Sequence, residues 1–201
     1  MKNLFGKLLI VLTVAVGFAA CKDNDNWYEE QLKQQELNQK RIDSTLNAQK
    51  SILQAYAMEH FDNPMMNDST GIWFDLIEVG DDESYEYMIS GQQIIVPTVT
   101  IKYKGELMDG TVFDETAEDK TANFRLGNVI PAWQIAFLPQ SINYNGEDVP
   151  IVGLTERGLK KGSKIRFITP SPYAYDNQPR EKIPANSPLV FEVNVVDIRN
   201  L

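Results

Sequence analysis

Alternation of apolar and polar side chains is clearest over residues 99–103 (VTIKY), where it predicts a β-strand with one buried face. The pair Asp109-Gly110 follows, and an Asp-Gly pair is a strong signal for a tight hairpin turn whose two central residues both adopt positive φ. Residues 112–114 (VFD) then predict the returning strand, which ends with an aromatic ring beside the carboxylate of Asp114. The pattern therefore predicts a β-hairpin that carries aromatic side chains and one acid.

The same kind of pattern predicts further strands over residues 71–80, 164–168 and 189–198 and a short strand segment after residue 86, while residues 94–97 lead into the hairpin. Residues 81–86 and 141–150 are polar and are expected to form loops, and residues 153–158 fit either a loop or a helix. A short helix is expected to begin near Pro131, because proline suits the first helical position. Several alternating strands with one short helix between them predict an α+β fold, in which an antiparallel sheet packs on that helix.

A long helix is predicted over residues 27–60, which are rich in Gln, Glu, Lys, Leu and Ala and contain no Gly or Pro. Residues 29–41 are almost wholly polar, whereas the second half has one apolar face formed by Ile42, Leu46, Leu53, Tyr56 and Ala57. That face is expected to pack on the following domain or on a second copy of the chain. The helix is therefore interpreted either as a stalk or as the contact of a homodimer.

His60 is the only histidine, and it stands where this helix should end. A single histidine argues against a Ser-His-Asp or Cys-His hydrolase and against a histidine-rich metal site. We interpret it as a helix-end residue. The chain also lacks a P-loop and a dinucleotide-binding fingerprint, so no cofactor and no metal are expected.

The first residues have the pattern of an export signal. Lys2 and Lys7 precede an apolar run over residues 8–20, which is shorter than the roughly 20 residues that span a bilayer. Two small residues then precede Cys21, the only cysteine, and this arrangement resembles the lipobox of bacterial lipoproteins, in which the cysteine is acylated. An ordinary signal peptide with an incidental cysteine is the alternative. The short run Lys22-Asp23-Asn24-Asp25, with two acids directly after the cysteine, resembles surface-export signals of Bacteroidetes lipoproteins.

Charge and composition limit the classes of molecule that this protein is expected to bind. The formal net charge is -9, and nucleic-acid binding requires clustered Lys and Arg, so no nucleic-acid partner is expected. The composition, 43% hydrophobic and 23% charged, is that of an ordinary globular domain once the first segment is set aside. The lone cysteine excludes an intrachain disulfide.

Four blocks along the chain together resemble the family of FKBP-type peptidyl-prolyl cis-trans isomerases, in the order that the family has them. They are IKYKGELMDGTVFDET, FRLGNVIPAW, GLKKGSKIRFITPSPYAY and IPANSPLVFEVNVVDI, and the resemblance covers about residues 71–198. It implies a twisted antiparallel sheet wrapped around a short helix. The expected organisation is then a lipoprotein signal peptide at 1–20, a helical stalk or dimerisation segment with a linker at 21–67, and an FKBP-like domain at 68–201.

The resemblance also implies a proline pocket. By motif, the residues that act on the substrate would be Tyr103, Asp114, Ile130 and Tyr175, and those that bind it would be Phe113, Phe124, Val129, Trp133, Ile183 and Phe191. The implied activity is isomerisation of X-Pro bonds in proline-containing peptides or unfolded exported proteins, by desolvating and twisting the amide. With Cys21 lipidated, the protein would act in the cell envelope, anchored to a membrane.

The chain also departs from the family pattern. Pro131-Ala132 replaces an Arg-Gly or similar pair before the tryptophan, Ala122 replaces an aromatic residue, and the loop after Tyr175 lacks the family's histidine. Residues 138–152 resemble an insertion. These departures favour an alternative, a binding module that keeps the pocket but has lost most catalysis. A third interpretation is a structural envelope lipoprotein whose helix mediates assembly.

Overall fold

The computed structural model of the chain describes residues 24–200, with side chains from residue 27 onward. The chain divides into two compact units between Asn38 and Gln39, inside the long helix α1 (Asn24–His60). The predicted signal peptide at 1–20 and Cys21 lie outside the described residues. No helix among the described residues is long and apolar enough to cross a membrane.

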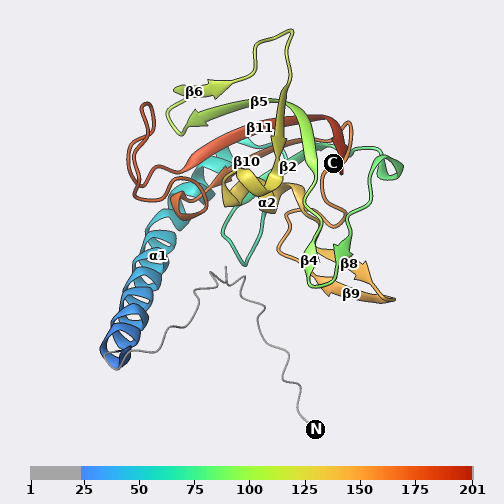
Figure 1. Cartoon of the computed structure of the whole chain (residues 1–201). Coiled ribbons are helices and arrows are strands. Elements are labelled where there is room, and N and C mark those ends of the chain that lie inside the picture. Colours follow the sequence, from blue (N-terminus) through green and yellow to red (C-terminus); the bar gives the residue numbers. More distant parts are fainter. Residues whose placement is uncertain (1–23, 201) are drawn as a thin grey trace. The chain divides into compact units, whose positions relative to one another are not determined.

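In the described part of the chain, seven strands form one sheet, and every pairing in it is antiparallel (Figure 1). In spatial order the strands of the main path are β1 (Met65–Met66), β2 (Trp73–Glu78), β10 (Lys164–Thr169), β11 (Leu189–Arg199), β5 (Thr98–Leu107) and β6 (Val112–Glu115). The seventh strand, β7 (Ala122–Arg125), pairs with β5. The short helix α2 (Pro131–Phe137) begins at the predicted proline. The predicted α+β fold, with its sheet, short helix and long N-terminal helix, is confirmed.

The turn between β5 and β6 differs from its prediction. The Leu107 N–H donates to the Thr111 carbonyl at 2.9 Å, which closes a three-residue loop, and only Gly110 in that loop has positive φ, +84°. The expectation that both residues of the Asp-Gly pair adopt positive φ was wrong. A turn followed by a left-handed glycine satisfies the hairpin twist with one such residue. Asp109 instead accepts a hydrogen bond from the Thr111 N–H at 2.9 Å.

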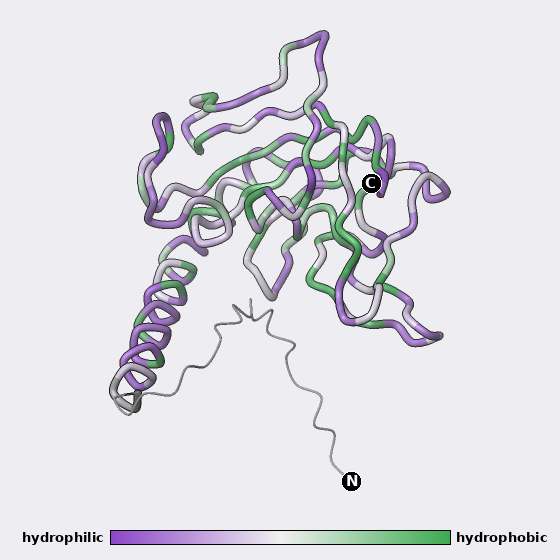
Figure 2. The backbone as a smooth tube through the Cα atoms, in the orientation of Figure 1, coloured by the Kyte–Doolittle hydropathy of each residue, from purple (hydrophilic) through white to green (hydrophobic). Residues whose placement is uncertain are grey.

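Both faces of the sheet are covered. On one face the strands pack with α2 in a large apolar core, and on the other a smaller cluster contains Leu53, Ala57 and Phe61 from the end of α1 and beyond it. Neighbouring strand residues point to opposite clusters, so Phe167 lies in the first and Ile168 in the second. In Figure 2 the sheet contains green, hydrophobic stretches, and α1 alternates purple, white and green along its length. Of the predicted apolar face of the helix, Leu53, Tyr56 and Ala57 therefore pack on the sheet, whereas Ile42 and Leu46 are only partly buried and belong to neither cluster.

Polar contacts hold the end of α1, which is His60 as the sequence predicts. The Arg166 guanidinium on β10 donates to the His60 carbonyl at 3.1 Å, and a cation at the carbonyl end of a helix is favourable. On the paired strand β2, the buried Asp75 accepts from the backbone N–H of Asp62 at 3.1 Å and of Asn63 at 3.4 Å. The chain is thus fixed as it leaves the helix.

The predicted polar loop at 141–150 is instead a β-hairpin, formed by β8 (Ser141–Tyr144) and β9 (Glu147–Pro150). Asn145 and Gly146 connect the strands with φ of +55° and +85°, the two-residue turn that an Asn-Gly pair favours. That pair was the signal in the sequence, and the polar composition hid it. Residues 153–158 are not helical.

The remaining elements are short. A second two-stranded hairpin contains β3 (Ile89–Ser90) and β4 (Gln93–Ile94). Single turns of 3-10 helix lie at η1 (Asp82–Ser84), η2 (Leu126–Asn128) and η3 (Ser171–Tyr173). Of these, η2 leads into α2 and η3 opens the long loop between β10 and β11, so both border the site described next.

Candidate functional site

Five aromatic side chains from five different elements meet on the α2 side of the sheet. We call them the aromatic cluster, and they are Tyr103 on β5, Phe113 on β6, Phe124 on β7, Trp133 on α2 and Phe191 on β11. All five contacts between rings within the cluster have centroid distances between 5.2 and 5.8 Å and edge-to-face geometry. Edge-to-face pairs are a favoured arrangement of aromatic rings, so the cluster is a well-packed apolar surface.

Trp133 lies at the centre of this cluster. Its ring centroid is 5.2 Å from that of Tyr103, 5.6 Å from Phe124 and 5.5 Å from Phe191, and only 4% of the residue is exposed. Its indole Nε1 is buried without a hydrogen-bond partner. The tryptophan therefore forms the base on which the half-buried rings of Tyr103 and Phe124 stand, and Phe113 joins the cluster through Phe191.

Tyr103 and Asp114 are joined across the β5–β6 hairpin. The phenol O–H of Tyr103 donates a hydrogen bond to Asp114 Oδ2 at 2.6 Å. Burial, followed by this hydrogen bond and the charge of Asp114, raises the pKa of the Tyr103 phenol above its ordinary value. Tyr103 is therefore a neutral hydrogen-bonded phenol, and its orientation is set by the acid.

The start of α2 presents backbone groups beside the cluster. Val129 and Ile130 pack partly buried against the main core, and the Gln134 side chain donates to the Val129 carbonyl at 3.2 Å. The Ile130 carbonyl accepts from the Trp133 N–H at 3.1 Å, which opens the helix. Within residues 24–200 the Ile130 N–H has no hydrogen-bond partner, so it is a donor available to a ligand.

The loop between β10 and β11 contributes Tyr175 and Ile183, which also pack against the main core. Ile183 is buried, while Tyr175 is half-buried with the Arg180 guanidinium 5.1 Å from its ring centroid. The backbones of Arg180 and Ile183 bond to each other at 2.8 and 3.1 Å. The structure thus places all ten sequence-predicted site residues on or next to one apolar core; their roles toward a substrate stay predictions.

Sequence reasoning missed Gly105, which lies on β5 between two rings of the cluster. A Cβ atom there would be 2.6 Å from Phe113 Cζ and 3.1 Å from Phe191 Cε1. The available signal was a glycine two residues after the predicted strand at 99–103 and before the turn, because a glycine beside a strand can mark close approach of another group to the backbone. Phe167 was also missed as a neighbour, and its ring lies 5.2 Å from that of Phe191.

Gly105→Ala is expected to destabilise the fold by about 1–3 kcal/mol, because the added methyl group forces both rings to move within a packed core. Urea unfolding followed by circular dichroism measures this change. Gly127→Ala is the matched control, since the nearest atom to its Cβ is 3.7 Å away. Equal stability of the Gly105→Ala and wild-type proteins would contradict the packing described here.

The described residues contain no group of three or more His, Cys, Asp or Glu side chains that could hold a metal ion. The site instead consists of the apolar aromatic cluster with polar groups at its border. These are the Tyr103–Asp114 pair, the Ile130 N–H and the Tyr175 phenol. Such an arrangement suits an apolar ring flanked by carbonyl groups.

Comparisons with known proteins agree with this chemistry. The family model described as FKBP-type peptidyl-prolyl cis-trans isomerase matches residues 95–196. The FKBP-type peptidyl-prolyl cis-trans isomerase FkpA of Escherichia coli (strain K12) is 32% identical over 132 residues, which are 65% of this chain and 39% of FkpA. A peptidyl-prolyl cis-trans isomerase of Saccharomyces cerevisiae is 35% identical over 104 residues, 51% of this chain and 21% of its own length. The chain therefore spans well under half the length of these relatives.

Solved structures show the same fold. The crystal structure of FkpA from Escherichia coli has a TM-score of 0.52 at 24% identity and covers 88% of this chain and 73% of that one. A peptidyl-prolyl cis-trans isomerase from Pseudomonas syringae pv. tomato has a TM-score of 0.51 at 21% identity, and covers 79% of this chain and 96% of that one.

Proposed function

This chain belongs to the family of FKBP-type peptidyl-prolyl cis-trans isomerases, and on that premise we propose that it accelerates cis-trans isomerisation of X-Pro bonds at the aromatic cluster. The observation that carries the proposal is Trp133, buried beneath three other rings of the cluster. A proline ring is apolar, compact and rigid, and an aromatic surface of this kind suits it. The substrates would be proline-containing peptides and unfolded exported proteins.

The chemistry needs no nucleophile. Amide resonance sets a barrier of about 18–20 kcal/mol for rotation about the peptide bond, and it is lost when the amide twists. A catalyst must therefore bind the twisted amide better than the planar one. The twisted amide is less polar, so an apolar site that removes water destabilises the planar form relative to it. In this protein the aromatic cluster would exclude water from the X-Pro peptide bond of the substrate.

Hydrogen bonds at the border of the cluster would hold the substrate while the bond rotates. The Ile130 N–H and the Tyr175 hydroxyl are two donors, and substrate carbonyls on either side of the proline are the acceptors they suit. Asp114 would keep Tyr103 in its orientation through the 2.6 Å hydrogen bond. Each of these groups acts by position, and no proton is transferred.

The rate is expected to be nearly flat between about pH 6 and 8, because no titrating group takes part. A tyrosine phenol is already protonated in this range, and burial followed by Asp114 raises the pKa of Tyr103 further from it. Through linkage, the raised pKa favours the folded state at neutral pH, and this contribution is lost only as the pH rises through the folded-state pKa. Protease-coupled isomerisation across this range is the measurement, and a steep bell-shaped profile would contradict the mechanism.

A second candidate is a binding module that uses the same aromatic cluster to bind a peptide but has little catalysis. It is favoured by Pro131-Ala132 at the start of α2 and by the β8–β9 hairpin, which occupies most of the insertion at 138–152. Isomerisation of a short X-Pro peptide by the purified chain separates the two. Acceleration supports the enzyme, whereas binding of the peptide without acceleration supports the module.

We also propose that the protein acts in the cell envelope, anchored through acylated Cys21 after removal of residues 1–20. The apolar run and the two small residues before the cysteine support this. Two or three acyl chains suffice for firm anchoring, since each buried methylene contributes about 0.8 kcal/mol. Metabolic labelling with radioactive palmitate tests it, and label retained by a Cys21→Ser protein would contradict it.

The part of α1 that ends at Asn38 would serve as a stalk or as the contact of a homodimer. It is polar overall but carries the exposed side chains of Trp27, Tyr28, Leu32 and Leu37. Sedimentation velocity of the purified chain distinguishes the two roles, since a monomer mass supports the stalk. A dimer mass that reverts to monomer in a Leu32→Glu, Leu37→Glu protein supports the homodimer.

A further inference from the structure

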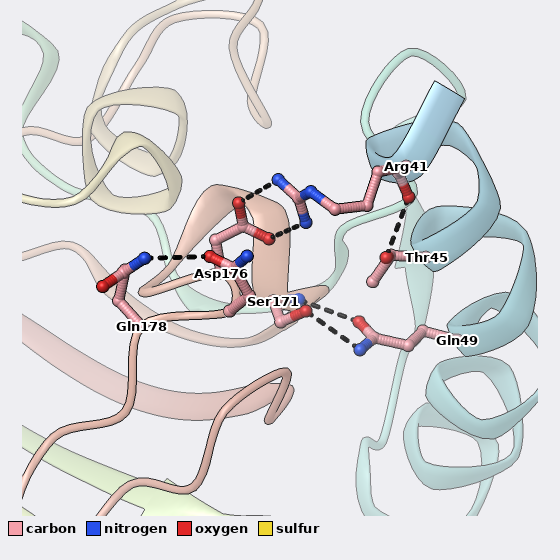
Figure 3. A network of polar contacts seen from close by, with 7 residues as sticks. Arg41, Thr45, Gln49, Ser171, Asp176 and Gln178 are labelled. Carbon is pink, nitrogen blue, oxygen red and sulfur yellow. Dashed lines mark hydrogen bonds and ion pairs between the residues drawn. The ribbon is translucent and has the colours of Figure 1, made fainter. Parts of the chain in front are cut away.

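The second half of α1 contacts the loop that carries Tyr175. Arg41 forms a two-pronged ion pair with Asp176, with Nη1 2.7 Å from Oδ1 and Nη2 2.5 Å from Oδ2 (Figure 3). Two turns further along, Gln49 contacts Ser171, which opens η3 (Figure 3). All four residues belong to the compact unit that begins at Gln39. A helix outside the family match thus contacts the residue next to Tyr175.

Gln49 is buried in the middle of the apolar face of α1, with 7% of the residue exposed. Its Oε1 accepts from the Ser171 N–H at 2.8 Å, and its Nε2 donates to Ser171 Oγ at 3.0 Å and to the Asn186 carbonyl at 2.9 Å. A buried amide is unfavourable unless such bonds are made, and here they all go to the loop. The amide therefore joins the two ends of the segment 171–186.

The loop backbone at these contacts adopts a conformation that L-residues seldom take. Asp176 and Asn186 have φ of +52° and +60°, and the Asn186 N–H donates to the Asp176 carbonyl at 2.8 Å. Asp and Asn tolerate this region better than other residues with a Cβ, but neighbouring contacts must hold it. Arg41 holds the first of these residues and Gln49 the second.

We propose that Arg41 and Gln49 are positioning residues that hold the loop at residues 171–186, and with it the Tyr175 hydroxyl and Ile183, in the geometry needed to bind X-Pro substrates. The inference rests on the proposed function. The ion pair acts one residue from Tyr175, and the Gln49 contacts close the loop on both sides of Tyr175 and Ile183. The long helix then serves the site directly, whatever its first half does.

The first test replaces Arg41 with Gln and Asp176 with Asn, singly and together, in the full chain. Asn keeps the tolerance for positive φ while removing the charge, and Lys50→Gln is the control for an exposed cation on the same helix. Each single variant is expected to lower kcat/KM about three- to tenfold, mostly through KM, because the hydroxyl holds the same carbonyl before and during rotation. The double variant is expected to match the singles.

The second test asks whether the effect passes through Tyr175. In a Tyr175→Phe background, Arg41→Gln is expected to change kcat/KM less than twofold, since the hydroxyl to be positioned is gone. The same three- to tenfold loss in that background would overturn the proposal, and so would wild-type kinetics of the folded Arg41→Gln protein.

Hydrogen exchange tests the proposal without relying on an activity measurement. Amides of residues 172–186 are expected to exchange faster in the Arg41→Gln protein than in the wild-type and Lys50→Gln proteins, while those of β5 stay unchanged. Unchanged exchange in the loop would overturn the proposal even if the wild-type protein is active. Absence of isomerisation by the wild-type protein would instead refute the proposed enzyme and leave the exchange result to decide on the loop.

Discussion

Trp133→Ala is expected to lower kcat/KM for an X-Pro peptide by about 10- to 100-fold. A large buried apolar side chain contributes about 1.5–3 kcal/mol of contact, and each 1.36 kcal/mol of transition-state stabilisation is a factor of ten in rate. The indole touches Tyr103, Phe124 and Phe191, so its loss removes the base of the cluster and admits water to the bond. Protease-coupled isomerisation at low temperature measures the effect.

Loss of activity must be separated from loss of structure, because removing a buried Trp destabilises a fold by about 3–5 kcal/mol. Phe137→Ala is the matched control. Phe137 is fully buried on the same helix but makes none of the ring contacts of the cluster. With both proteins folded by circular dichroism, we expect the control to keep most of its activity. Equal losses in both variants, or none in Trp133→Ala, would refute the assignment of the site.

Leu53→Ala is expected to lower the free energy of unfolding by about 2–5 kcal/mol. Leu53 is 1% exposed and belongs to the cluster between α1 and the sheet, together with Trp73, Ile168 and Val190. Shortening it leaves a cavity that the surrounding side chains fill only in part. Urea unfolding at equilibrium measures the change.

Ile52→Ala is the control on the adjacent residue, because Ile52 is 45% exposed and its replacement is expected to change stability by less than about 1 kcal/mol. Similar losses for both variants would mean that α1 does not present the described face to the sheet. If Leu53→Ala alone is destabilised, the second half of the helix is part of the folded unit, as the proposed role of Arg41 and Gln49 requires.

Local patterns predicted most elements. The alternation at residues 99–103 and 189–198, the proline at the start of α2 and the end of α1 at His60 all agree with the structure. The failures were also local. At Asp109-Gly110 a three-residue loop replaced the two-residue turn, and at Asn145-Gly146 a hairpin signal was hidden by polar composition. The first failure concerns how a turn divides its residues, and the second concerns a turn signal that was overlooked in a polar segment.

The proposed site came from the family resemblance of four sequence blocks rather than from periodicity. Composition alone does not distinguish a pocket aromatic such as Phe124 from a core aromatic such as Phe167, because both stand on alternating strands. The structure distinguishes them by burial, since Phe124 is half-exposed at the surface of the cluster and Phe167 is fully buried. Gly105 lies inside the first of the four blocks, but it was not among the residues assigned to the site from that block.

By itself, the sequence determined which faces are apolar, where α1 and α2 lie along the chain, and which family the chain resembles. Only the tertiary structure decided what lies against each face. Arg41 meets Asp176 across 135 residues and Gln49 meets Ser171 across 122, and no local pattern contains such a pairing. The periodicity of a segment predicts whether a side chain is buried. Which residue it then contacts depends on how the whole sheet and its helices pack.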